Sequence, residues 1–237
     1  MRYRSILVVT YGRSGSTLLQ GILNSIGGVV VRGENNEFCY WLYQAWKSLL
    51  LTKKHTNSSH SPKDSWYGAN YLNPPLFMSE VRKLIRDQLL PEGQADVCYG
   101  FKEIRYLKHL DELAPYLDFL AAVFPEPAFI FNTRDHEDVC NSGWWKNHDS
   151  KSLIKSLATA DNLFTQYVDD HANAFLVKYE DVISAPDQLK ALFRFLGAPF
   201  DEVQLRSVLK TAHGYGQKAE TLEKARIRGA FDNDKHR

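Results

Sequence analysis

A loop rich in glycine and hydroxyl side chains stands near the start of the chain, with one arginine inside it. Residues 11–17 read YGRSGST and follow an apolar run at residues 6–9. A loop that leads from a buried strand into a helix points backbone amides and the positive end of the helix dipole at one spot. The pattern predicts an anion site built from Gly12, Arg13, Ser14, Gly15, Ser16 and Thr17. The alternative interpretation is a tight turn with ordinary helix capping.

The spacing of this loop excludes two familiar kinds of phosphate site. A Walker A loop needs four residues between its glycines and then Gly-Lys-Ser/Thr, whereas only Arg13 and Ser14 stand between Gly12 and Gly15. A phosphatase loop of the cysteine type needs a nucleophilic cysteine before the arginine, and this turn has none. A magnesium-dependent nucleotide triphosphatase is therefore disfavoured.

A second candidate anion site follows the apolar run at residues 129–133. Arg134 comes directly after that run, and Ser142 stands eight positions later (142 − 134). Eight residues are a little over two helical turns, so on one helix the serine could reach the phosphate that the arginine pairs with. The alternatives are an ordinary ion pair of Arg134 with Asp135 or Asp138 and a solvent-facing Ser142.

The elements that must position these residues alternate between strands and helices. Apolar runs typical of buried strands lie at residues 6–9, 29–31, 97–101, 129–133 and 175–177. Helical spacing lies between and after them, at about residues 18–26, 36–51, 77–90, 107–120, 139–144, 152–168 and 189–196. This alternation predicts an α/β fold with a central parallel sheet, helices on both faces and ligands beyond the carboxyl ends of the strands.

Bulk properties limit the remaining possibilities. We expect one domain over residues 1–237, with an insertion at about 53–75 near the site and a loosely ordered tail at about 211–237. A net charge of +1 gives no indication of nucleic acid as a partner. Cys39, Cys98 and Cys140 are widely spaced without a CxxC pair, which argues against disulfides and a metal site. With no apolar run long enough for a membrane span or an export signal, a cytoplasmic location is expected.

Two stretches resemble the nucleotide-binding motifs of sulfotransferases that use 3′-phosphoadenosine-5′-phosphosulfate (PAPS). Residues 10–23, TYGRSGSTLLQGIL, resemble the family's 5′-phosphosulfate loop, with Arg13 in the basic position. Residues 129–145, FIFNTRDHEDVCNSGWW, resemble its 3′-phosphate motif, with Arg134 and Ser142 at the motif spacing, and residues 179–181 look like a further family segment. The resemblance implies a P-loop-like three-layer fold and an enzyme that moves a sulfuryl group from PAPS to a hydroxyl group, leaving PAP, without a metal ion.

The resemblance also implies roles for three residues in catalysis. Arg13 and Lys102 would stabilise charge around the transferred group, and Glu34 would accept the proton of the acceptor. Glu34 stands 21 positions after Arg13 (34 − 13), a spacing similar to that of tyrosylprotein sulfotransferases. Glu37 is the alternative base. Either glutamate could instead be a helix-terminal residue favoured by the dipole, and Lys102 a solvated strand-end lysine.

The acceptor is predicted only as a class. Gly12 replaces the proline of the small-molecule enzymes. The sequences GENN at residues 33–36 and FKEIR at residues 101–105 look more like those of bacterial sulfotransferases that modify glycans. We therefore expect a glycan or glycolipid acceptor. An aromatic group on the second predicted helix could stack on a sugar or belong to the core: Tyr40, Trp41, Tyr43 and Trp46.

Two other functions stay open at this point. One is a PAP- or nucleotide-binding module without turnover, and the other is a nucleotide or sugar kinase with a degenerate loop, which magnesium dependence would reveal. His109 and His136 are the next candidate bases if neither glutamate serves. The sequence does not fix the oligomeric state or whether tail residues such as Lys218 touch the nucleotide.

Overall fold

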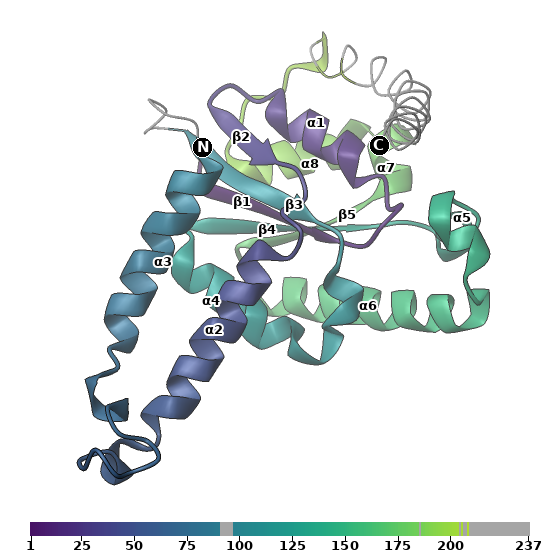
Figure 1. Cartoon of the computed structure of the whole chain (residues 1–237). Helices are drawn as coiled ribbons and strands as arrows, with labels where there is room; N and C mark the ends of the chain where they lie inside the picture. The colour runs from purple at the N-terminus through teal and green to yellow at the C-terminus, as the bar shows by residue number, and fades with distance from the viewer. Residues whose placement is uncertain (91–96, 185, 204, 206–207, 209–237) are drawn as a thin grey trace, which may run out of the picture.

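The described strands form one parallel sheet. The computed structural model describes residues 1–90, 97–184, 186–203, 205 and 208. Within them, five strands pair in the order β2-β3-β1-β4-β5, every pair parallel (Figure 1). The strands are β1 (Ser5–Thr10), β2 (Val29–Arg32), β3 (Cys98–Glu103), β4 (Pro127–Thr133) and β5 (Ala174–Lys178). The predicted α/β class with a central parallel sheet and a P-loop-like three-layer fold is confirmed.

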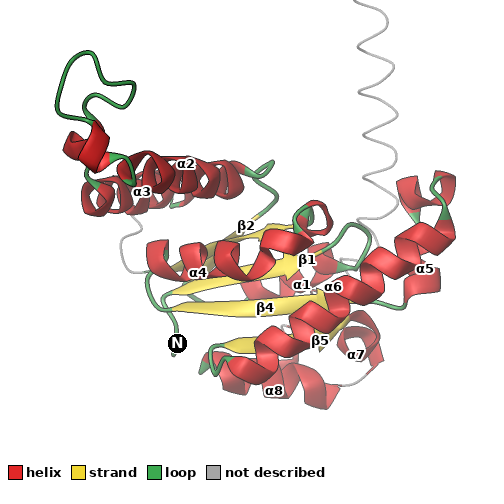
Figure 2. Cartoon of the chain, turned by 90° about the horizontal axis from the view of Figure 1, so that it is seen from below, coloured by secondary structure: helices red, strands yellow, loops and turns green. Residues whose placement is uncertain are grey.

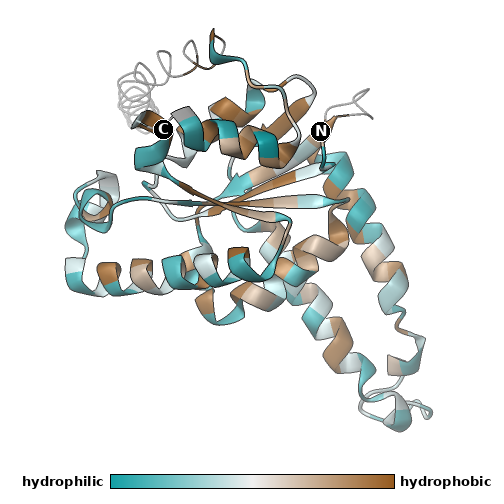
Figure 3. Cartoon of the chain, turned by 180° about the vertical axis from the view of Figure 1, so that it is seen from behind, coloured by the Kyte–Doolittle hydropathy of each residue, from teal (hydrophilic) through white to brown (hydrophobic). Residues whose placement is uncertain are grey.

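Helices cover both faces of this sheet because every residue of β1 is buried and successive side chains point to opposite sides. Ile6 and Val8 pack on the side of α1 and α8, whereas Leu7 and Val9 pack on the side of α4 and α6. Figure 1 shows these two helix layers above and below the strands, and Figure 3 shows the hydrophobic residues gathered in the strands and on the helix sides that face them. The continuous apolar run therefore marks a strand between two cores.

The helices follow the sequence expectations closely in most places. They are α1 (Ser16–Asn24), α2 (Phe38–Lys53), α3 (Pro74–Leu89), α4 (Leu113–Val123), α5 (His136–Cys140), α6 (Ser150–Asp170), α7 (Tyr179–Ser184) and α8 (Pro186–Leu196). Short 3-10 turns are η1 (Thr56–Ser58), η2 (Ala69–Tyr71), η3 (Tyr106–Lys108), η4 (Leu110–Glu112) and η5 (Gly143–Asn147). The stretch expected as one helix from residue 107 begins with two of these turns, so α4 starts later than predicted.

The helix expected through Val139 and Trp144 is also shorter than predicted. The helix α5 ends at Cys140, and Gly143 opens η5 with a φ of 57°, a backbone conformation that interrupts a helix. Ser142 stands between the two with an extended backbone. The argument that Ser142 and Arg134 share one helical face is therefore wrong, and their relation has to come from tertiary structure.

Helices α2 and α3 pair into an arm that projects from the sheet (Figure 1, Figure 2). The 16 residues of α2 carry the chain about 24 Å at 1.5 Å per residue. Residues 53–75, expected near the site, join the two helices at the far end of this arm. On α2 itself, Tyr40 and Tyr43 are buried, whereas Trp41 is 61% exposed.

The last predictions about organisation concern the tail and membrane segments. The tail at 211–237, with Lys218, lies outside the described residues. Among the described residues, no helix has both the length and the apolar character that a membrane span requires.

Candidate active site

The glycine-rich loop joins the central strand β1 to α1 at the carboxyl edge of the sheet. The chain leaves β1 toward β2 and β3 on one side and later returns to β4 on the other, which makes this edge the topological switch point where ligands bind in open α/β sheets. Gly15 is the residue before α1, and no side chain caps that helix start. The first amides of α1 lack carbonyl partners within the helix, so they are available to an anion.

Gly15 is required at its position for two reasons. Its φ is +81°, in the left-handed region that side chains disfavour, and a Cβ there would lie 2.1 Å from Cδ2 of Tyr179. The ring of Tyr179, at the start of α7, therefore lies directly against the loop backbone. Arg13 has a positive φ as well, 70°, a backbone conformation that costs free energy in a residue other than glycine.

The two predicted anion-binding segments contact each other. Arg13 Nε donates to Ser142 Oγ at 2.9 Å, and Arg134 Nη1 donates to the carbonyl oxygen of Arg13 at 3.2 Å. These contacts join residues more than a hundred positions apart. The sequence motifs at 10–23 and 129–145 therefore form one site in space.

The serine inside the loop is held internally. Ser14 is buried, and its Oγ lies 2.7 Å from Thr10 Oγ1, which lies 2.6 Å from the carbonyl oxygen of Asn132. Ser14 thus ties the loop to β4 through its side chain. Ser16 and Thr17, by contrast, line the open cleft.

The guanidinium group of Arg134 contacts other residues through two of its three nitrogens. Its Nη2 donates to Asp138 at 3.1 Å, and its guanidinium lies 4.6 Å from the ring centre of Tyr179. The Asp138 side chain is 59% exposed, so this ion pair is weak. Nε of Arg134 is buried and has no hydrogen-bond partner in the described part of the chain. The ion pair anticipated from the sequence exists, and an unsatisfied donor stands beside it.

Glu34 is paired with two cations. Lys102 Nζ lies 2.8 Å from Glu34 Oε1, and Arg105 Nη1 lies 3.3 Å from Glu34 Oε2. The Lys102 side chain is only 6% exposed, whereas that of Glu34 is 34% exposed. The lysine is therefore a largely buried charge with a carboxylate partner rather than a solvated strand-end residue.

The buried carboxylate of Glu103 fixes the residues around Glu34 through hydrogen bonds. Its side chain is 4% exposed and accepts hydrogen bonds from Arg105 Nη1 at 2.8 Å and from the amide of Glu37 at 3.1 Å. The amide of Ile104 donates to the same carboxylate at 2.8 Å. Glu103 thus orients both Arg105 and the segment that carries Glu34.

Glu37 and the two candidate histidines are occupied elsewhere. Glu37 accepts hydrogen bonds from Lys108 at 2.8 Å and His109 at 2.7 Å. Burial raises the pKa of Glu37, but the hydrogen bonds from Lys108 and His109 together lower it by more than burial raises it. The pKa of Glu37 is therefore below its usual value. His136 lies 2.8 Å from Asp161 on α6, and none of Glu37, His109 and His136 lines the cleft described next.

An open cleft of about 380 Å³ collects most of the predicted site residues. It is lined by Arg13, Gly15, Ser16, Thr17, Leu18, Glu34, Lys102, Ile104, Arg134, Trp144 and Tyr179. Gly12 packs against Trp144, and a Cβ at Gly12 would lie 2.6 Å from the Trp144 ring. Ser142 does not line the cleft but is hydrogen-bonded to Arg13, which does. No residue of the 53–75 segment lines the cleft.

A comparison with protein-family models decides the family. The model described as "Sulfotransferase family" matches residues 5–202 of this 237-residue chain. The chain belongs to the sulfotransferase family. The resemblance noted in the sequence is confirmed at this level.

Solved sulfotransferase structures share the fold. The sulfotransferase domain from the Synechococcus PCC 7002 olefin synthase has a TM-score of 0.52 and 18% identity, covering 84% of this chain and 75% of that one. The sulfotransferase domain from the curacin biosynthetic pathway has a TM-score of 0.50 and 15% identity, covering 85% and 76%. A comparison with curated proteins finds no match.

Four cleft residues of this sulfotransferase were not assigned from the sequence: Leu18, Ile104, Trp144 and Tyr179. Trp144 lies 5.6 Å from the Arg13 guanidinium, measured to its ring centre, Tyr179 packs on Gly15, and Ile104 follows β3. Trp144 stands inside the motif at 129–145 and Tyr179 inside the segment at 179–181, so both could have been picked by their position. In the described residues no group of three or more His, Cys, Asp and Glu side chains is arranged to hold a metal ion.

Proposed function

We propose that this sulfotransferase moves a sulfuryl group from PAPS to a hydroxyl group of an acceptor by in-line displacement. The observation that carries the proposal is the contact between the two arginine-bearing segments, Arg13 Nε to Ser142 Oγ at 2.9 Å and Arg134 Nη1 to the Arg13 carbonyl at 3.2 Å. PAPS carries phosphate on both its 5′ and 3′ sides. Two cationic segments that meet at one cleft suit such a ligand.

The nucleotide would be held by backbone and side-chain donors together. Gly12, Gly15 and the uncapped start of α1 would bind the 5′ side through amides, with Ser14, Ser16 and Thr17 beside them. Arg134 and Ser142 would bind the 3′-phosphate, and the unpartnered Nε of Arg134 supports this assignment because an unsatisfied buried donor costs free energy. Bound PAPS supplies the sulfuryl group.

The remaining cleft residues would carry out the transfer. Glu34 accepts the proton of the acceptor hydroxyl while the hydroxyl oxygen bonds to sulfur and the bond from sulfur to the bridging oxygen breaks, leaving PAP. Lys102 and Arg13 stabilise the negative charge on the sulfuryl and leaving oxygens. The 2.8 Å pair of Lys102 with Glu34 supports this division, since both groups reach the same part of the cleft.

We also propose a glycan or glycolipid acceptor and a cytoplasmic location. Trp144, 49% exposed, lines the cleft and offers a flat apolar surface to a sugar ring. Cys39, Cys98 and Cys140 are buried free thiols, which suits a reducing compartment.

The test is transfer of label from radiolabelled PAPS to a panel of glycans and lipid-linked glycans, in the presence of a chelator. The proposal requires labelled product and released PAP, with both reduced in the Arg134→Ala variant at limiting PAPS. Tight PAP binding without release of PAP from PAPS would favour a binding module. Magnesium-dependent transfer from ATP would identify a kinase instead.

A further inference from the structure

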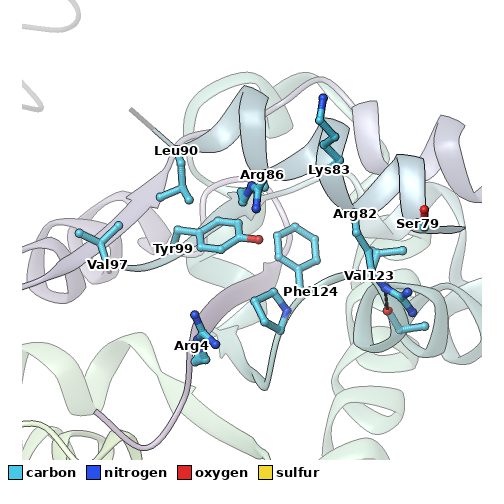
Figure 4. Close-up of a pocket in the computed structure, with 12 residues that line it drawn as sticks. Arg4, Ser79, Arg82, Lys83, Arg86, Leu90, Val97, Tyr99, Val123 and Phe124 are labelled. Carbon is cyan, nitrogen blue, oxygen red and sulfur yellow. Dashed lines mark hydrogen bonds between the residues drawn. The ribbon is translucent and has the colours of Figure 1, made fainter. Parts of the chain in front are cut away.

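A second cleft lies at the opposite end of the sheet from the nucleotide site. It has a volume of about 580 Å³ and opens where β1, β3 and β4 begin, whereas the candidate active site lies where they end. Its walls come from the residues before β1 and β4, the start of β3 and one side of α3 (Figure 4). A volume of this size is within the range of about 300–1,000 Å³ that small-molecule sites occupy.

Among the residues that the structure describes, the charged side chains that line this cleft are all cations. Its lining residues are Arg4, Ser79, Arg82, Lys83, Arg86, Leu90, Val97, Tyr99, Ala122, Val123, Phe124 and Pro125. Four of them are cations and none is a carboxylate, in a protein whose 29 basic and 28 acidic residues almost balance. Like charges on separate elements repel across a cleft unless an anion lies between them.

Structural roles account for part of this charge. Arg82 Nε donates to the carbonyl oxygen of Ala122 at the end of α4, and Lys83 and Arg86 each lie 3.4 Å from Asp87. A cation in the last turn of α3 is also favoured by the helix dipole, which explains Arg86.

Arg4 has no such explanation. It stands before β1, on a different element from the other three cations, and no described side chain pairs with its guanidinium. Its backbone is fixed because the amide of Tyr99 donates to the Arg4 carbonyl oxygen at 3.2 Å and the Arg4 amide donates to the backbone carbonyl oxygen of Glu126 at 3.2 Å. The backbone of Arg4 is thus anchored at the edge of the cleft, and within the described residues no carboxylate pairs with its charge.

A tyrosine hydroxyl lies between Arg4 and Arg86. Figure 4 shows the Tyr99 hydroxyl pointing into the cleft, near Arg86 and the Phe124 ring, with the Arg4 guanidinium on the other side. Burial raises the pKa of Tyr99, and the positive charges of Arg86 and Arg4 oppose that rise, as expected for guanidinium groups close to the phenol. Within the described part of the chain, no residue is hydrogen-bonded to this hydroxyl.

The apolar part of the lining indicates more than a free inorganic anion. The rings of Tyr99 and Phe124 have centroids 5.9 Å apart, and Leu90, Val97 and Val123 lie around them. An anionic group at the two arginines would therefore have an apolar surface beside it for the rest of the same molecule.

We propose that this cleft is a second ligand site, which binds a phosphate ester carried on an apolar body. Arg4, Arg86 and the Tyr99 hydroxyl hold the phosphate, while Phe124, Leu90 and Val97 contact the body. The site is separate from the nucleotide cleft and does not depend on the function proposed above. The phosphate ester has two possible sources, a soluble aryl phosphate and a lipid phosphate.

The experiment is calorimetric titration of the full chain with four probes: phenyl phosphate, geranyl phosphate, inorganic phosphate and phenol. At least one ester should bind about tenfold or more tightly than inorganic phosphate, and phenol should not bind. Geranyl phosphate binding better than phenyl phosphate identifies the lipid source, and the reverse order identifies the soluble one. Failure of both esters to bind better than inorganic phosphate overturns the proposal.

Variants locate the bound ester. Arg4→Ala and Arg86→Ala should each weaken ester binding by about tenfold or more, since each removes a charge-assisted hydrogen bond. Arg194→Ala, an exposed arginine on α8, is the matched control and should bind the ester like the wild type. Arg134→Ala tests the other cleft. Loss of ester binding in Arg134→Ala, with binding kept in Arg4→Ala, would place the ester at the nucleotide site and overturn the proposal.

Discussion

Lys102 donates to Glu34 across 2.8 Å, and the lysine is nearly buried while the glutamate reaches the open cleft. A buried lysine without a counter-charge is costly, so the pair with Glu34 stabilises Lys102. We expect an anionic group in the cleft to give Lys102 a second negative partner, which would leave Glu34 able to accept a proton. The candidate base and the candidate charge stabiliser thus form one unit.

The first prediction concerns the base. Glu34→Gln should lower turnover by about 10²–10⁴, because the amide cannot accept the acceptor proton. PAP affinity should stay the same or increase slightly, since removing a carboxylate beside an anion removes repulsion. Single-turnover kinetics with labelled PAPS and calorimetry with PAP measure the two effects.

Glu37→Gln is the matched control, because Glu37 lies near Glu34 in sequence but is bound to Lys108 and His109. It should keep most of the turnover. If Glu37→Gln abolishes turnover and Glu34→Gln does not, the base is misassigned. If neither change matters, His109 and His136 are the next residues to test.

The second prediction concerns the 3′-phosphate. Arg134→Ala should weaken PAP binding by about 1.5–3 kcal/mol, the range for hydrogen bonds to charged groups. The binding of AMP, which lacks the 3′-phosphate, should be weakened much less by the same substitution. Calorimetry with both nucleotides measures the difference, and Arg194→Ala controls for loss of an exposed arginine. Equal losses for PAP and AMP would mean that Arg134 does not read the 3′-phosphate.

The third prediction concerns the loop backbone. Gly15→Ala forces a side chain into a φ of +81° and places its Cβ 2.1 Å from the Tyr179 ring. The left-handed conformation alone costs roughly 1–2 kcal/mol. Urea unfolding should show at least this loss, and PAP binding should fall with it. Gly27→Ala is the control, since nothing lies within 4 Å of its Cβ. Wild-type stability of Gly15→Ala would disprove the close contact with Tyr179.

The fourth prediction concerns pH. The pKa of Glu37 is lowered in the folded protein, so its charged form stabilises the fold above its unfolded pKa of about 4.3. That contribution is lost as the pH falls through the lower folded pKa. Wild type should therefore exceed Glu37→Gln in unfolding free energy at pH 7, with the gap closing at acid pH. A gap that stays constant from pH 7 into this acid range would rule out the effect.

Much of the fold could be predicted from local pattern. The run at residues 6–9 has apolar residues on both faces, a pattern typical of a strand that lies between two helix layers. The strand β1 lies between two such layers. The end of α5 could not be read in the same way. Gly143 is one residue in an otherwise helix-compatible stretch, and the reason a side chain does not fit there is tertiary: a Cβ would lie 2.8 Å from Nε of Arg13.

The sequence motifs named most of the residues that line the cleft, but not the contacts between them. The motif spacing identified Arg13, Arg134 and Ser142, but on the premise that Ser142 continues a helix. Contact between Arg13 and Ser142 joins positions 129 residues apart, and no local pattern encodes such a pair. The same holds for Glu103, whose role follows from burial at the end of β3 beside the Glu34 segment.

The central claim is that one cleft binds a nucleotide with phosphates on both its 5′ and 3′ sides, without a metal ion. Thermal unfolding of the full chain with PAP or AMP, each in the presence of a chelator, tests this most directly. The account predicts a much larger rise in Tm with PAP than with AMP, because PAP alone engages both anion-binding segments. Equal shifts with the two nucleotides, or a shift with PAP that requires magnesium, would contradict it.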